Sequence, residues 1–273
     1  MHFIGMQGLL LALQLVFGYS NEYRNADSGL THFPLDVPRN VTTIFLQRNQ
    51  IQSVSPTDFE DMHNLRSLYL FDNMLTIWPD VGSAVKPNLE LMQLGNNLIS
   101  DLTPNQTQGL VSLQRIKLYM NRFTKFPDLG DAKKSLTILS FKDNFISYVD
   151  KDMFKGMEKL TTLVLAGNQI STMPDMHFLN LSNFETIDLK NNPVAAIFPW
   201  GVGPLNRTKT GVVQMPSAAL VCDCRFMYFA HFIRQHADME LTAICDNPAT
   251  LKGLRVDSEV DTSQFVCPGT NNQ

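Results

Sequence analysis

The chain has 273 residues, of which 18% are charged and 44% are hydrophobic, as is ordinary for a folded globular protein. Its formal net charge is −4 and its isoelectric point about 5.8, values that argue against a nucleic-acid or strongly anionic partner. This length is compatible with a single elongated domain.

Residues 1–20 are predicted to be a secretory signal peptide. An apolar run from about Gly8 to Phe17 is followed by Gly18 and Ser20, the small residues expected before a cut after Ser20. The run is short for a membrane span. Because no Lys or Arg precedes the run, the alternative of a buried N-terminal helix or membrane anchor stays open.

Residues 21–40 are predicted to form an N-terminal cap without cysteines. This stretch contains Pro34 and Pro38 just before the first regular segment. We expect residues 28–40 to cover the end of the fold by pairing as an edge strand.

Residues 41–198 contain about seven copies of one pattern, which begin with VTTIFLQRNQI at Val41 and LRSLYLFDNML at Leu65. Each copy carries one asparagine, and successive asparagines are 24, 24, 24, 23, 24 and 24 residues apart. Such a period indicates a repeat array in which stacked units share one core. We predict that each amide satisfies backbone groups of the turn that leaves each strand. The asparagines are Asn49, Asn73, Asn97, Asn121, Asn144, Asn168 and Asn192.

The spacing L-x-x-L-x-L-x-x-N-x-L resembles the leucine-rich repeat family. The resemblance implies an α/β solenoid, a horseshoe with a parallel concave β-sheet and a convex side of irregular segments and short helices. Alternate repeats carry a Pro-Asp pair after the strand, which disfavours long convex helices. The other repeats have room for one helical turn, with Phe59, Leu110 and Phe154 facing inward.

Residues 199–221 separate the last clear repeat from the cysteines. They form either a degenerate eighth repeat or a protruding loop, and Trp200 is correspondingly either core or an exposed contact. Residues 222–267 are predicted to be a cysteine-rich C-terminal cap, followed by a short polar tail at 268–273.

The four cysteines are predicted to form two disulfides, because an even number in an exported chain is typical of a disulfide framework. Three pairings are possible, and a bridge between Cys222 and Cys224 is disfavoured. The stretch resembles the C-terminal flank of extracellular leucine-rich repeat proteins, which implies the pairs Cys222–Cys245 and Cys224–Cys267. A zinc site with His231 or His236 is the weaker alternative, since no C-x-x-C is present. An apolar helical stripe should cover the last repeat: Phe226, Phe229, Ala230 and Ile233.

Export is also indicated by N-x-[ST] sequons at Asn40, Asn105, Asn180 and Asn206. No second apolar span follows, and the tail PGTNNQ carries no lipid-anchor signal. The expectation is therefore a secreted, extracellular glycoprotein, unless the chain is a fragment of a longer receptor.

Strand alternation sends the residues between the leucines to the concave face. The first concave column is Phe45, Tyr69, Gln93, Lys117, Ser140, Val164 and Asp188, and the second is Gln47, Phe71, Gly95, Tyr119, Lys142, Ala166 and Lys190. Aromatic and basic residues of this kind are typical of interface hot spots, although scattered exposed apolar residues are also common. The predicted ligand-binding residues are Phe45, Arg66, Tyr69, Phe71, Gln93, Arg115, Lys117, Tyr119 and Lys142.

These features predict noncovalent recognition of a protein ligand on the concave face, as in a receptor ectodomain, an adhesion protein or an immune recognition protein. The alternative is a structural matrix component that acts through self-association or multivalent contacts. The chain has no G-x-S-x-G, phosphate loop or H-E-x-x-H, and none of its six histidines falls in a concave column. We therefore predict no enzyme activity, no cofactor and no metal, and the oligomeric state and ligand stay open.

Overall fold

A computed structural model describes most of the repeat region and parts of the cap. The described residues are 21–150, 152–173, 183, 185–194, 196–197, 212–214, 222–224, 226–227, 230–231, 234, 240–241, 244–256 and 258–265. Trp200, Asn180, Asn206, Cys267 and residues 1–20 lie outside them.

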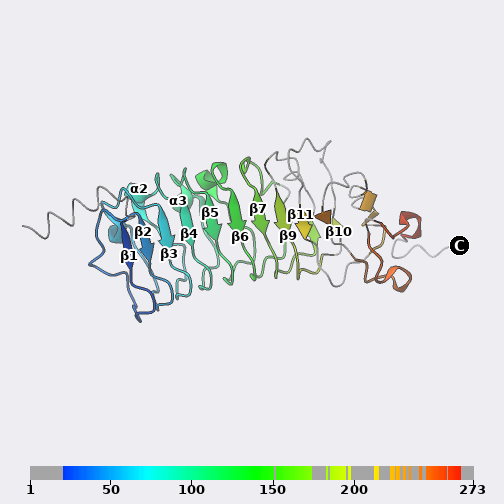
Figure 1. The fold of residues 1–273 in the computed structure, drawn as a ribbon, viewed down its shortest axis with the longest axis horizontal. Helices are drawn as coiled ribbons and strands as arrows, with labels where there is room; N and C mark the ends of the chain where they lie inside the picture. The colour runs from blue at the N-terminus through cyan, green and yellow to red at the C-terminus, as the bar shows by residue number, and fades with distance from the viewer. Residues whose placement is uncertain are drawn as a thin grey trace, which may run out of the picture.

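One parallel sheet runs along the molecule, with short strands side by side in a single row (Figure 1). Its order is β1-β2-β3-β4-β5-β6-β7-β9-β11-β12, which follows the chain, so each repeat adds one strand next to the last. The bounds are β1 Glu22–Arg24, β2 Thr43–Phe45, β3 Ser67–Tyr69, β4 Leu91–Gln93, β5 Arg115–Lys117, β6 Ile138–Ser140, β7 Thr162–Val164, β9 Thr186–Asp188, β11 Val212–Gln214 and β12 Glu240–Leu241.

The apolar residues of the pattern form a continuous core behind this sheet. Leu65, Leu68, Leu70 and Leu75, from a single repeat, are all completely buried. Corresponding residues of neighbouring repeats pack on them and belong to the same cluster. Because one repeat cannot enclose its own apolar side chains, stacking of the coils buries them. The predicted leucine-rich solenoid is confirmed.

The asparagine ladder is present as the sequence predicts. The Asn73 side chain accepts a hydrogen bond from the Ile51 N–H at 3.0 Å and donates to the carbonyl oxygens of Leu46 and Leu70 at 2.9 and 3.1 Å. Asn121 makes the equivalent bonds to Ile99, Leu94 and Leu118. Each amide thus joins two coils, where unpaired backbone groups would be costly.

The convex side consists of single helical turns and irregular segments. Phe59 and Leu110 are completely buried and Phe154 is 7% exposed, so all three face inward as expected. Helical turns also occur after the Pro-Asp pairs, and each is only four or five residues long. The turns are η1 Pro56–Phe59, α2 Gly82–Val85, α3 Pro104–Thr107 and η2 Gly130–Lys134, and a two-stranded sheet pairs β8 Thr172–Met173 with β10 Ala196–Ile197.

The N-terminal cap differs from the expectation in one respect. The edge strand is β1, which pairs with β2, whereas residues 28–40 contain no strand. That stretch instead inserts Phe33 and Val37 into the core, where the Phe33 ring meets Phe59 at 4.9 Å. The backbone N–H groups of Ser28 and Leu30 both donate to the side-chain oxygen of Asn49 at 3.0 Å. The first ladder asparagine therefore holds the cap.

At the other end, β11 continues the sheet beside β9, with Val212 opposite Thr186. This strand falls within the 199–221 stretch, and its pairing favours the eighth-repeat alternative over a protruding loop. Cys222 and Cys245 form a disulfide, and Phe226 and Ala230 of the apolar stripe are completely buried. Cys224 is also disulfide-bonded, while Phe229 and Ile233 lie outside the described residues. The cap further contains η4 Ala249–Leu251 and η5 Thr262–Gln264.

Candidate interaction surface

The first concave column is assembled by strand register. Phe45 lies opposite Tyr69, Tyr69 opposite Gln93, and Gln93 opposite Lys117, and the pairing continues through Ser140. Neighbouring side chains in a column are separated by about one inter-strand spacing, roughly 4.8 Å. Residues one repeat apart in sequence, 23 or 24 positions, are thus presented side by side on one face.

An aromatic stack occupies the N-terminal end of this column. The rings of Phe45 and Tyr69 are nearly parallel, with an interplanar angle of 19° and centroids 4.5 Å apart. The guanidinium carbon of Arg24 lies 4.0 Å from the Phe45 centroid, within range of a cation–π contact. The three side chains form a layered, pre-ordered surface, and both rings are half-buried rather than fully exposed.

In the second column, Tyr119 lies across Gly95 of the preceding repeat. A Cβ added to Gly95 would sit 2.1 Å from Cζ of Tyr119, so the absent side chain makes room for the ring. Burial, and then the nearby Asp72 carboxylate, raise the pKa of the Tyr119 phenol above its ordinary 10.0. The ring is therefore held between repeats and stays neutral at physiological pH.

Arg115, Lys117 and Lys142 add positive charge beside the aromatic rings. Arg115 and Lys142 are exposed and Lys117 is half-buried. Lys142 lies 3.6 Å from an Asp143 carboxylate oxygen, whereas Arg115 and Lys117 form no ion pair with the described part of the chain. Two cations thus remain available to an acidic group.

Arg66 is set apart from the other predicted residues. It precedes β3, at the flank of the sheet, and its guanidinium forms an ion pair with Glu90 of the next repeat. The remaining predicted residues lie together on the concave face. We call this set the concave patch: Phe45, Tyr69, Phe71, Gln93, Arg115, Lys117, Tyr119 and Lys142, together with Arg24.

The sequence did not predict Arg24, because the recurring pattern begins at Val41 and gave no register for residues 21–40. Pairing of β1 with β2 places Arg24 directly opposite Phe45. Gln47 was recognised as a column residue but not as a site residue. Its side-chain oxygen is buried and accepts no hydrogen bond from the described residues.

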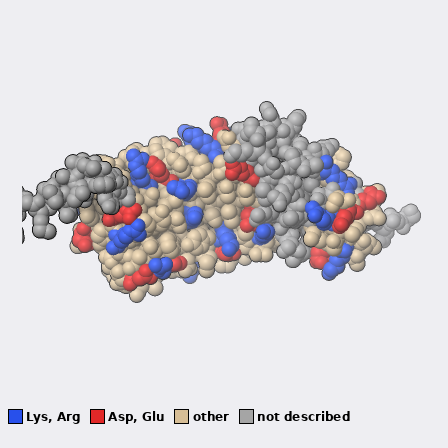
Figure 2. Space-filling model, viewed as in Figure 1, with Lys and Arg blue, Asp and Glu red and all other residues tan. Residues whose placement is uncertain are grey.

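The charges on the face seen in Figure 2 are mixed. Lys and Arg side chains are interspersed with Asp and Glu, and no broad field of one sign covers the repeats. On the rim, the Arg48 guanidinium donates to both Asp27 carboxylate oxygens at 2.6 and 2.7 Å, which lowers the pKa of that carboxyl. A mixed surface of this kind favours specific complementarity over nonspecific attraction.

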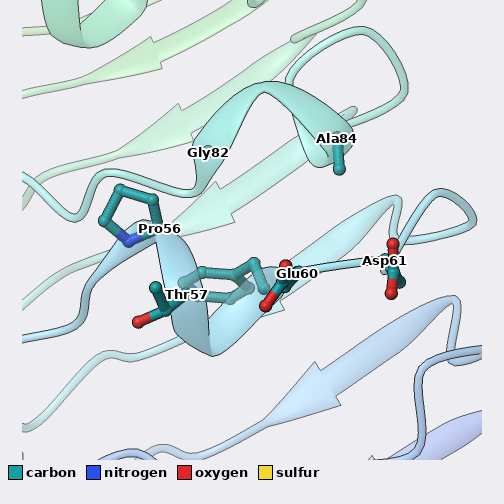
Figure 3. A pocket seen from close by; sticks show the side chains of 7 residues that line it. Pro56, Thr57, Glu60, Asp61, Gly82 and Ala84 are labelled. Carbon is teal, nitrogen blue, oxygen red and sulfur yellow. The ribbon is translucent and has the colours of Figure 1, made fainter.

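The convex side has shallow hollows between the helical turns of neighbouring repeats. One of about 270 Å³ lies between η1 and α2, and Figure 3 shows Pro56, Thr57, Glu60 and Ala84 around it. It lacks a cluster of convergent polar groups of the kind that fixes a small ligand. No group of three or more His, Cys, Asp or Glu suited to a metal occurs within the described ranges.

Two of the four sequons fall in the described residues. Asn40 is exposed just before the first repeat, and Asn105 is exposed on α3. Both are outside the concave columns. Within the described part of the chain, no helix has the length and apolar character to cross a membrane.

Comparison with known proteins agrees with this architecture. Residues 31–75 and 134–194 match the leucine rich repeat family. Human leucine-rich repeats and immunoglobulin-like domains protein 1 is 30% identical over 170 residues, which is 62% of this chain but 16% of the human protein. The chain thus spans a small part of that relative's length.

Two solved structures have a similar fold. Human 5T4, also called Wnt-activated inhibitory factor 1 or trophoblast glycoprotein, superimposes with a TM-score of 0.70 over 90% of this chain and 94% of its own, at 19% identity. Toll in the Toll–Spatzle complex of Drosophila superimposes with a TM-score of 0.66 over 84% of this chain and 33% of its own, at 21% identity. At these identities the likeness concerns the fold alone.

The repeat, the asparagine ladder, the parallel sheet and the C-terminal disulfide therefore lead to one assignment. The described part of this chain forms a leucine-rich repeat solenoid, and the Cys222–Cys245 disulfide in its C-terminal region fits a cysteine cap.

Proposed function

We propose that this protein is a secreted recognition protein that binds a protein ligand noncovalently on the concave patch. The single observation that carries the proposal is the layered arrangement of Arg24, Phe45 and Tyr69. It combines flat aromatic surface with a fixed cation, and both are typical of the residues that dominate interface energies.

The patch is preformed, which supports binding rather than another use of the face. Tyr69 is held by Phe45, and Tyr119 is seated over Gly95. Side chains that are already ordered lose little rotamer freedom when a partner docks. Ligand binding would therefore require little rearrangement of the sheet.

The chemistry of the patch suggests a ligand surface with apolar side chains and at least one acidic group. Aromatic rings at Phe45, Tyr69 and Tyr119 offer apolar contact, while Arg115 and Lys117 can pair with a carboxylate. Binding here needs no catalytic group, cofactor or metal.

Export is part of the proposal. A disulfide between Cys222 and Cys245 is typical of an oxidising compartment, and the exposed Asn40 and Asn105 are available as glycan acceptors. The apolar N-terminal run has the form of a signal peptide.

The proposal is tested by affinity capture from the extracellular fluid of the source organism. The bait is the glycosylated protein, compared with a Tyr69→Ala/Tyr119→Ala variant and a Leu35→Ala/Val111→Ala control. Leu35 and Val111 are exposed apolar residues away from the concave columns, 94% and 56% exposed respectively. A protein retained by wild type and control but lost from the concave variant supports the proposal, and equal retention by all three baits contradicts it.

A further inference from the structure

Exposed apolar side chains also gather away from the concave patch, along the edge where the chain leaves each strand. Met74 and Ile77 of one repeat are 44% and 56% exposed, and Phe145 and Tyr148 of another are 49% and 57% exposed. The concave columns do not include them. These two pairs occupy corresponding places three repeats apart, so they offer matching apolar contacts to a second surface.

Two rows define this edge surface. The turn row holds the residue after each of the first six ladder asparagines, and the edge row holds the residue three places further on. The turn row is Gln50, Met74, Leu98, Arg122, Phe145 and Gln169, and the edge row is Ser53, Ile77, Asp101, Lys125, Tyr148 and Thr172.

Backbone contacts fix the order of both rows. The N–H of Met74 donates to the Ile51 carbonyl at 2.9 Å, and that of Phe145 donates to the Phe123 carbonyl at 2.9 Å. In the edge row, Lys125 and Tyr148 form a parallel β-bridge. The Lys125 ammonium lies 3.2 Å from the Asp101 carboxylate. Residues that neighbour each other in a row are therefore neighbours in space.

The edge row has a reversible order of chemical types. From Ser53 to Thr172 the residues are polar, apolar, acidic, basic, apolar and polar. When the row is read backwards the order of types is the same, except that the acidic and basic residues exchange positions. The turn row is polar, apolar, apolar, basic, apolar and polar, so its central pair is Leu98 and Arg122. The long aliphatic stem of an arginine can pack on a leucine. Each row is thus complementary to its own reverse.

We propose that this edge surface binds a second copy of the same chain, with the two solenoids antiparallel. A twofold axis between the repeats of Asp101 and Lys125 would place each row against the same row of the partner. The two facing rows would run in opposite directions. Ile77 would meet the partner's Tyr148, and Lys125 would meet the partner's Asp101. Self-complementary surfaces of this kind form closed isologous dimers.

Like charges at the rim oppose this arrangement and limit its affinity. Asp72 and Asp143 lie beside the turn row and would face each other across the axis. Asp72 already accepts a hydrogen bond from the Asn96 amide at 2.8 Å, and Asp143 lies 3.6 Å from the Lys142 ammonium. The described sequon residues Asn40 and Asn105 belong to neither row.

The axis runs from the concave side to the convex side, so both concave sheets of the dimer would open in the same direction. Two concave patches would then lie next to each other, which allows one bivalent ligand to engage both. The rows extend over about 24 Å, five strand spacings of roughly 4.8 Å. Because this is small for a permanent interface, we expect a reversible dimer with a dissociation constant on the order of micromolar.

Sedimentation equilibrium of the glycosylated full chain, at concentrations from about 1 to 100 μM around that expected constant, tests the proposal. The wild type should change from monomer to dimer. Ile77→Arg should weaken the dimer at least about tenfold, because it places unpaired charge against an apolar side chain. Val111→Arg is the matched control, since Val111 is equally exposed but lies in neither row. A wild type that stays monomeric throughout would overturn the proposal.

A charge exchange tests the antiparallel register directly. Asp101→Lys alone and Lys125→Asp alone should each abolish dimerisation, because like charges would then face each other twice across the axis. A mixture of the two variants should form a heterodimer, because each introduced charge then meets its opposite on the partner. Fluorescent labelling of one variant separates the two species, and circular dichroism verifies folding. A mixture that stays monomeric, or single variants that still dimerise, would refute this register.

Discussion

The ring of Tyr119 occupies the space that a side chain at Gly95 would fill, with Cζ only 2.1 Å from the place of a Cβ atom. A glycine in one repeat thereby sets the conformation of an aromatic residue in the next. The concave patch consequently depends on a residue that cannot itself make a side-chain contact.

Gly95→Ala should therefore displace the Tyr119 ring while the coil remains folded. We expect a loss of stability of about 1 kcal/mol, measured by denaturant unfolding, because one half-buried contact is rearranged. Binding of a captured ligand should fall about as far as in Tyr119→Ala. In a Tyr119→Ala background, Gly95→Ala should have no further effect on binding, whereas additive losses would show that the two residues act separately.

The titration of Tyr119 should report its position between the repeats. Its pKa is raised first by burial and then by Asp72, so Asp72→Asn should lower the pKa only partly and leave it above 10.0. The phenolate absorbance of each protein, minus that of its Tyr119→Phe counterpart, isolates this tyrosine. A pKa that drops to 10.0 in Asp72→Asn would show that charge, not burial, is the larger cause.

The raised pKa of Tyr119 also makes the stability of the fold depend on pH. Because the folded pKa exceeds the unfolded one, the associated stabilisation is complete below the unfolded pKa and is lost as the pH rises through the folded pKa. Wild type should therefore lose stability between those two values relative to Tyr119→Phe. Parallel unfolding curves for the two proteins across that range would contradict this linkage.

The ladder asparagines should be among the most sensitive polar residues of the repeats. Asn121→Ala leaves the buried Ile99 N–H without its acceptor and removes one of the two asparagine donors to each of the Leu94 and Leu118 carbonyl groups. We expect a loss of about 1–3 kcal/mol in the free energy of unfolding. Asn64→Ala, at an exposed turn, is the control and should change stability by less than about 0.5 kcal/mol. Equal effects of the two substitutions would disprove the ladder account.

The C-terminal cap should depend on its disulfide. Cys222 and Cys245 are 23 residues apart, and a loop of that size corresponds to roughly 3 kcal/mol of stabilisation by constraint of the unfolded chain. Cys222→Ser/Cys245→Ser should lower the midpoint of denaturant unfolding accordingly. Peptide mapping under nonreducing conditions checks the second predicted pair, Cys224–Cys267. Recovery of Cys267 with any other cysteine would refute that pairing.

Much of the fold was predictable because the repeat carries its own register. The spacing of the asparagines located strands β2–β7 and β9, their buried leucines and the two concave columns without further information. Tertiary context determined the rest: β1 finds its place only by pairing with β2, which is why Arg24 was missed. The columns placed Tyr69 and Tyr119 on the concave face but did not show that both are half-buried, because stacking on Phe45 and seating over Gly95 are contacts between repeats.

The most direct test of the central proposal is the affinity of the captured ligand for wild type, Tyr69→Ala and the control Val111→Ala, measured by calorimetry. If the concave patch is the binding surface, Tyr69→Ala should weaken binding at least about tenfold, a loss of roughly 1.4 kcal/mol, because Tyr69 forms the aromatic stack with Phe45. Val111→Ala should bind as wild type does. Equal affinities for Tyr69→Ala and Val111→Ala would contradict recognition through the concave patch.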